Sequence, residues 1–152
     1  MPALSVEEVL KQIRRLPAMG QLDSEKFADE DGWADSLAVF FVQKDEKERK
    51  ERLKPTQLRK VFHALKDVER QCKGQKDDAP FDVAKVLHLK PELAYALGRE
   101  LIPKEFYDLM KECLTASKLK TVADYKRLVE FVTAILAYHK YRKEVGVKGG
   151  QK

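Results

Sequence analysis

The sequence predicts an all-α protein, a compact bundle of five or six helices, and three observations support this prediction. Apolar residues recur at three- and four-residue steps in several segments, which is typical of amphipathic helices. No run alternates apolar and polar residues between turn signals, so no strand is expected. The 152 residues are 43% hydrophobic and 36% charged, which suits one globular domain with a heavily charged exterior.

The first third of the chain should contain two helices and a less regular acidic stretch. Ser5 and Glu8 form a capping box ahead of an apolar series that Pro17 and Gly20 end. The stretch 23–31 is acidic and fits either a short helix or an ordered loop. A further helix should begin near Asp35. The charge run 44–52 contains no apolar residue and fits a solvated helix end or a linker.

The remaining helices have clearer boundaries. Pro55 suits the first turn of a helix over 56–73, because its missing N–H is not needed there. A helix or a pair of helices should cover 81–101, with Pro91 as a kink or a fresh start. Pro103 opens another helix to about Ser117. The last helix runs from about Val122 to Arg142, before a tail with three glycines.

Charge and cysteine usage narrow the functional classes. The net charge of +5 favours polyanionic partners, although it does not distinguish RNA, DNA and an anionic membrane. Cys72 and Cys113 both fall on apolar helix faces and are expected to be buried, reduced thiols in the cytoplasm. No signal peptide, membrane span or metal-ligand spacing is recognised, and no enzyme motif is present. We therefore expect no cofactor, no metal and no catalytic activity.

One face of the helix at 56–73 carries a row of basic side chains. At about 100° per residue, the row falls within an arc of about 80°, well away from the apolar face. Such a row can track a phosphate backbone. It also fits a face that only keeps the protein soluble. The members of the row are Arg59, His63, Lys66, Arg70 and Lys73.

Two other segments offer ligand candidates. Tyr95 and Arg99 lie four residues apart, so the ring can stack on a base beside a guanidinium that holds phosphate, or both can serve packing. The last helix has an apolar arc about 200° wide, which predicts a central position or an interface shared with another subunit. His139 lies inside this arc and is expected to be a core residue. The ligand candidates at or beyond its margin are Lys126, Arg127 and Lys140.

Three segments, in this order and spacing, resemble the small subunit of type III-A CRISPR–Cas effector complexes, the Csm complexes. They are Thr56-Gln57-Leu58-Arg59-Lys60, the stretch 89–99 (LKPELAYALGR), and Ala137-Tyr138-His139-Lys140. The resemblance covers residues 53–142. It divides the chain into N-terminal helices with a charged linker (1–52) packed on the bundle, the helical core (53–142), and a flexible tail (143–152).

The resemblance implies a non-catalytic, cytoplasmic subunit with a role in antiviral defence. Copies stack into a filament along other subunits of the effector complex and bind the backbone of the guide RNA–target RNA duplex. Sequence is then read by base pairing, while the protein holds the backbone. The RNA contacts that it implies are Lys54, Gln57, Arg59 and Lys60, then Lys90, Tyr95 and Arg99, then Lys140.

A different class of function also fits the sequence. A helical protein–protein adaptor that binds no nucleic acid would carry the same basic row as a solubilising face. A membrane-surface helix fits less well, because the basic helices also have an ordinary core face, and no membrane partner is expected. Copies are also expected to associate with one another, as filament neighbours in the complex or as a homodimer when isolated.

Overall fold

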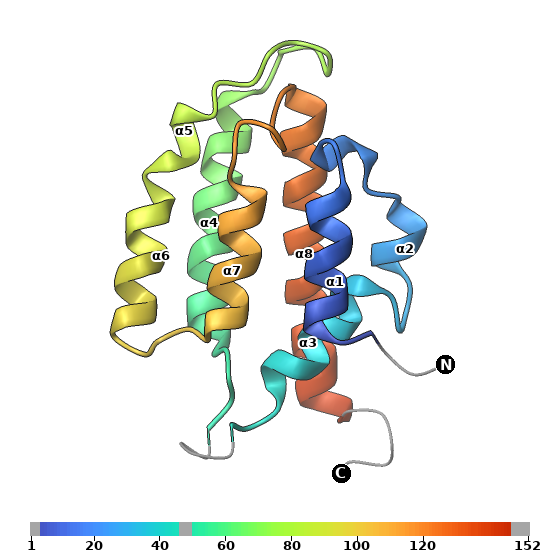
Figure 1. Ribbon diagram of the computed structural model, residues 1–152, viewed down its shortest axis with the longest axis vertical. Helices are drawn as coiled ribbons and strands as arrows, with labels where there is room; N and C mark the ends of the chain where they lie inside the picture. The colour runs from blue at the N-terminus through green and yellow to red at the C-terminus, as the bar shows by residue number, and fades with distance from the viewer. Residues whose placement is uncertain (1–3, 46–49, 147–152) are drawn as a thin grey trace.

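The computed structural model describes residues 4–45 and 50–146, and helices are the only extended regular elements within them (Figure 1). Six helices have ten residues or more: α1 (Val6–Arg15), α3 (Trp33–Val42), α4 (Pro55–Gln71), α6 (Leu89–Gly98), α7 (Lys104–Cys113) and α8 (Val122–Val145). The short elements are η1 (Met19–Gln21), α2 (Ser24–Ala28) and α5 (Ala84–Leu87). The all-α prediction is confirmed.

α8 is the centre of the bundle. It packs against α3, α4, η1 and α2, and α4 and α6 lie on one side of it while α1 and α2 lie on the other (Figure 1). Its wide apolar arc is buried inside the protein, with Leu128, Phe131 and Ile135 fully enclosed. The predicted central position is therefore confirmed, and this arc is already covered by the chain's own helices.

Aromatic pairs fix how the helices meet in the core. The rings of Phe41 and Phe106 pack edge to face with centroids 5.7 Å apart, and this contact links α3 to α7. Phe81 stacks on Tyr125 at 4.5 Å. The buried Tyr125 hydroxyl donates to the Leu65 carbonyl at 2.5 Å, so α8 is fastened to α4 by a polar contact as well as by packing.

Most helix boundaries follow the predicted signals. Ser5 and Glu8 form the capping box that begins α1. Pro55 is the first residue of α4. The stretch 81–101 is a pair of helices, and Pro91 lies in the first turn of α6, where its missing N–H costs nothing. The acidic stretch 23–31 contains the short helix α2, which Asp23 caps.

Three boundaries differ from the prediction. α3 begins at Trp33, ahead of the predicted start near Asp35, because the turn at Gly32 already ends the preceding segment. α7 ends at Cys113 and not near Ser117. α8 continues to Val145, and its last turn is fastened by Arg142. The predicted charge run falls partly, and the predicted tail mostly, on residues 46–49 and 147–152, which lie outside the described residues.

A buried ion pair joins α3 to α8. Arg142 Nε and an Nη atom donate to the two Asp35 carboxylate oxygens at 2.7 and 2.6 Å. Asp35 is fully buried and Arg142 is 4% exposed. A two-pronged pair of this kind fixes the register of the two helices as well as their separation. Over the described ranges, no helix has the length and apolar character needed to cross a membrane.

Candidate nucleic-acid interface

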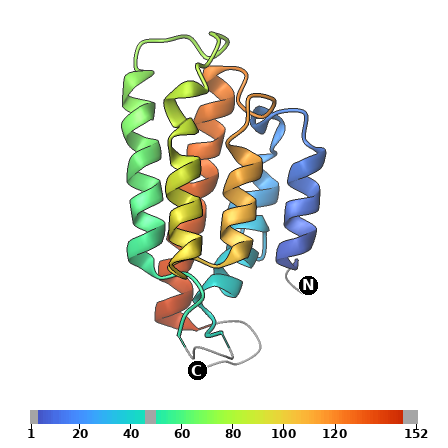
Figure 2. The same cartoon turned by 60° about the vertical axis from the view of Figure 1, so that its left-hand side comes forward.

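α4 lies at the edge of the bundle and presents its basic side to solvent. The helix packs against α8 through Leu58, Leu65 and Val68, which are buried (Figure 2, green helix). The opposite side carries cations along its whole length. We call this surface the α4 ridge, and its members are Arg59, Lys60, His63, Lys66 and Arg70 of α4, with Lys73 in the turn that follows the helix.

Only some of the cations on the α4 ridge are held by neighbouring acids. Lys66 pairs with Glu69 at 2.8 Å, and Arg70 pairs with Asp67. Arg59, Lys60 and Lys73 are exposed and make no ion pair within the part of the chain that the structure describes. Lys73 was in the basic row but not in the predicted RNA-binding set. These three side chains are the ones most ready to meet a phosphate.

The structure brings parts of the first two family-like segments together at a groove between α4 and α6. α4 packs less closely against α6 than against α8, which leaves a space of about 370 Å³. Gln57 and Lys60 line one wall, and Pro91, Glu92 and Tyr95 line the other. The floor is apolar. Its residues are Val61, Ala64, Leu93, Ala96 and Ile102.

Tyr95 and Arg99 form a unit on the rim of this groove. The Tyr95 side chain is 64% exposed, and its hydroxyl accepts a hydrogen bond from an Arg99 Nη atom at 3.0 Å. The guanidinium carbon lies 5.7 Å from the ring centroid. Because Arg99 makes no ion pair among the described residues, its charge is available to an anion. The pair offers a ring face and a cation together, as stacking on a base beside its phosphate requires.

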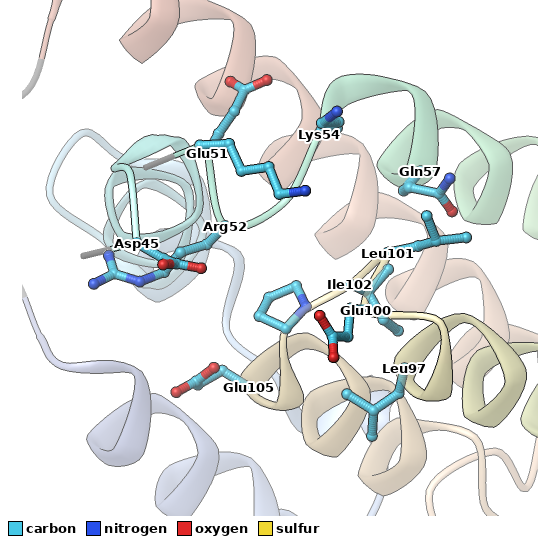
Figure 3. A pocket seen from close by; sticks show the side chains of 12 residues that line it. Asp45, Glu51, Arg52, Lys54, Gln57, Leu97, Glu100, Leu101, Ile102 and Glu105 are labelled. Atoms are coloured by element: carbon cyan, nitrogen blue, oxygen red, sulfur yellow. The ribbon is translucent and has the colours of Figure 1, made fainter. Parts of the chain in front are cut away.

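A second hollow, at the lower end of α4, has mixed charge. Figure 3 shows Lys54 and Gln57 on one side of it and Glu100 and Glu105 on the other. It is the larger space, at about 410 Å³. Among the described residues, four carboxylates line it, against the one, Glu92, that lines the groove, and carboxylates repel phosphate, so its size does not make it the better RNA site. Lys54, which is exposed, lines this hollow and not the groove, whereas Gln57 lines both.

The other predicted residues lie away from the groove. Lys90 is half-buried and lies on the side of α6 turned away from Tyr95, about 140° round the helix. Lys126 pairs with Asp77 at 2.8 Å, and Lys140 pairs with Glu144 at 3.1 Å. The hydrogen bond to Asp77 raises the pKa of Lys126.

Arg127 is used inside the fold. Its guanidinium donates to the Leu22 carbonyl, pairs with Glu130 at 2.9 Å and lies 6.0 Å from the Phe27 ring centroid. These contacts fasten α8 to the η1–α2 region. Sequence periodicity placed Arg127 at the margin of the apolar arc, but it could not show that this margin faces another part of the same chain.

His139 is a core residue, as predicted. It is 1% exposed, and its Nε2 lies 2.7 Å from the Leu53 carbonyl oxygen. The neutral ring with its proton on Nε2 donates this hydrogen bond. Burial lowers the pKa of His139, against a smaller raising effect of the hydrogen bond. The charges of Lys143 and Arg59 add smaller lowering effects.

The comparisons with known proteins identify one related family. A family model described as Csm2 Type III-A matches residues 41–145, which is more than half of the chain and includes α4, α6 and α8. No curated protein and no solved structure matches the chain.

Proposed function

Because the chain belongs to the Csm2 Type III-A family and is a small subunit of a type III-A CRISPR effector complex, we propose that it is a non-catalytic scaffold for RNA. In this proposal it binds the backbone of the guide RNA–target RNA duplex through the α4 ridge and the groove between α4 and α6. Copies stack into a filament beside the other subunits, in the cytoplasm and without a cofactor.

The single observation that carries the proposal is the convergence at the groove. Gln57 and Lys60 come from one segment, and Tyr95 from another, yet they line the same space. Lys60 brings positive charge to the α4 wall. On the α6 wall Tyr95 supplies an exposed aromatic face beside the Glu92 carboxylate, and Arg99, just outside the lining, donates a hydrogen bond to the Tyr95 hydroxyl. This combination matches the requirements of a polynucleotide, which needs cations for phosphate and flat surfaces for bases.

The α4 ridge extends this surface along one helix. The ridge has five Lys and Arg side chains and, within the described part of the chain, only two nearby carboxylates, those of Asp67 and Glu69, so its net charge is positive. The pairs that hold Lys66 and Arg70 are intrahelical and partly or largely exposed. Such pairs contribute about 0.3–0.5 kcal/mol. A phosphate can therefore draw both side chains away from their acids at little cost.

The test removes the two adjacent exposed cations and measures RNA binding by the assembled complex. We expect Arg59→Gln with Lys60→Gln to weaken binding of target RNA at low salt. Each lost phosphate contact should reduce the slope of log K against log salt by about 0.7–0.9. The matched control is Lys104→Gln with Lys111→Gln, which removes the same charge from exposed positions on α7.

Unchanged affinity and salt slope in a correctly folded Arg59, Lys60 variant would refute the assignment of this surface. The rival adaptor function makes a different prediction for the whole complex. If the basic ridge only solubilises the protein, the ridge variant and the control variant should lose RNA affinity equally, or neither should lose any. Incorporation of both variants into the complex, measured by co-purification, separates lost RNA binding from lost assembly.

A further inference from the structure

A further hollow, lined by basic side chains, lies on the opposite side of the bundle from α4. It is a space of about 340 Å³ between α1 and the α2–α3 turn, on the side of the molecule that carries α1 and α2 in Figure 1. Lys11 and Arg15 reach it from α1, and Lys26 reaches it from α2. The remaining lining residues are Leu4, Glu8, Gln12 and Trp33.

The three cations at this hollow are not neutralised by the protein. None of them makes an ion pair within residues 4–45 and 50–146. Arg14, their neighbour on α1, does have a partner, because it lies 3.6 Å from Glu112 of α7. Among the described residues that line the hollow, the single carboxylate is that of Glu8, which is committed to the capping box and accepts the Ser5 backbone N–H at 3.0 Å. The hollow therefore concentrates positive charge.

The local fold places the backbones that carry these side chains around one hollow. Lys11 and Arg15 are four residues apart on one helix face, where like charges repel each other. Lys26 is brought opposite them by the turn at Gly32, whose N–H donates to the Asp29 carbonyl at 2.8 Å. A Cβ atom at position 32 would lie 2.6 Å from the Lys26 carbonyl oxygen, so only glycine fits this turn. The turn therefore fixes the backbone that leads from Lys26 to α3, and the exposed side chains of the three cations line the hollow from there and from α1.

We propose that this hollow binds a phosphate group. An anion seated between the three cations converts their mutual repulsion into attraction, and the Arg15 guanidinium offers the forked donor geometry that suits phosphate oxygens. Gln12 adds an amide donor at the same wall. The site lies before the residues matched by the family model, and it does not depend on the RNA surface proposed above. The phosphate can come from an RNA backbone or from a small phosphate compound.

The test measures thermal stability of the full chain in inorganic phosphate and in chloride at equal ionic strength. A ligand that binds only the folded state raises the Tm, by about 3–6 °C when its concentration is ten times its Kd. We expect this rise in the wild-type protein and in Arg14→Gln. We expect Lys11→Gln with Arg15→Gln to lose it. Lys26→Gln, on a different element, should reduce it and guards against a folding defect in α1.

Two outcomes overturn the proposal: no phosphate-dependent rise in the wild-type protein, or the same rise in the Lys11, Arg15 variant. A glutamate-rich peptide that raises the Tm more than phosphate does would also overturn it, in favour of an acidic protein partner. A parallel titration with single-stranded RNA identifies the source of the phosphate. Weaker RNA binding by the Lys11, Arg15 variant than by Arg14→Gln indicates the backbone, and equal binding indicates a small phosphate compound.

Discussion

The buried Arg142–Asp35 pair gives a stability prediction that can be worked out from the structure. In Arg142→Met the apolar stem is kept, but the Asp35 carboxylate loses both guanidinium hydrogen bonds. It keeps the Asp31 backbone N–H at 2.8 Å. Removing one partner of a buried pair costs about 3–5 kcal/mol, because the other charge stays in the interior without its counter-charge. For a chain of this size, that loss lowers the Tm by about 6–20 °C.

Urea denaturation followed by circular dichroism at 222 nm measures this loss directly. Adding Asp35→Asn to Arg142→Met removes the stranded charge, so the double variant should be more stable than Arg142→Met alone. The matched surface control is Lys104→Met, which breaks the exposed pair with Asp108 and should cost less than about 1 kcal/mol. A loss below about 1 kcal/mol for Arg142→Met, or additive losses in the double variant, would refute the reasoning.

Three further predictions concern buried groups. Burial lowers the pKa of His139 from its ordinary 6.5, so the unfolded chain binds the proton more strongly than the folded chain does. The Tm should therefore be level above about pH 6.5 and fall as the pH is lowered below it. In His139→Gln the Tm should depend less on pH. Burial raises the pKa of Cys113 to about 12, and Cys72 is 2% exposed, so Ellman's reagent at pH 8 should label neither thiol until urea unfolds the protein. The Asp124 carboxylate accepts backbone N–H groups at 2.8–3.0 Å from η1 and from the start of α8. Asp124→Ala should therefore lower the free energy of unfolding, measured by urea denaturation, by about 2–4 kcal/mol. A loss under about 1 kcal/mol would contradict this role.

The features that sequence could predict are those decided within one or two helical turns. The capping box at Ser5 depends on a residue three positions away, and Pro91 could begin a helix because its own ring sets the geometry. The Asp35–Arg142 pair joins residues 107 positions apart. Each looked like an ordinary helix-end charge in the sequence, and only the packing of α3 on α8 makes them a buried pair.

The same distinction applies to the candidate interface. Periodicity identified the basic row of α4, since helical spacing alone decides which side chains share a face. It could not identify α6 as the helix beside Gln57 and Lys60, and so it could not predict the groove. The family-like segment containing Lys90 and Tyr95 illustrates this point, because of these two predicted RNA contacts Tyr95 lines the groove and Lys90 does not. The roles of these residues in RNA binding stay predictions.

The position of α8 has a consequence for how the protein is made. Its 24 residues span about 36 Å, and they contact helices that were synthesised roughly a hundred residues earlier. Contacts so distant along the chain slow folding, even in a helical protein. The apolar faces of α3 and α4 stay uncovered until α8 has left the ribosome, so a nascent or truncated chain without α8 should be a target for chaperones and proteases.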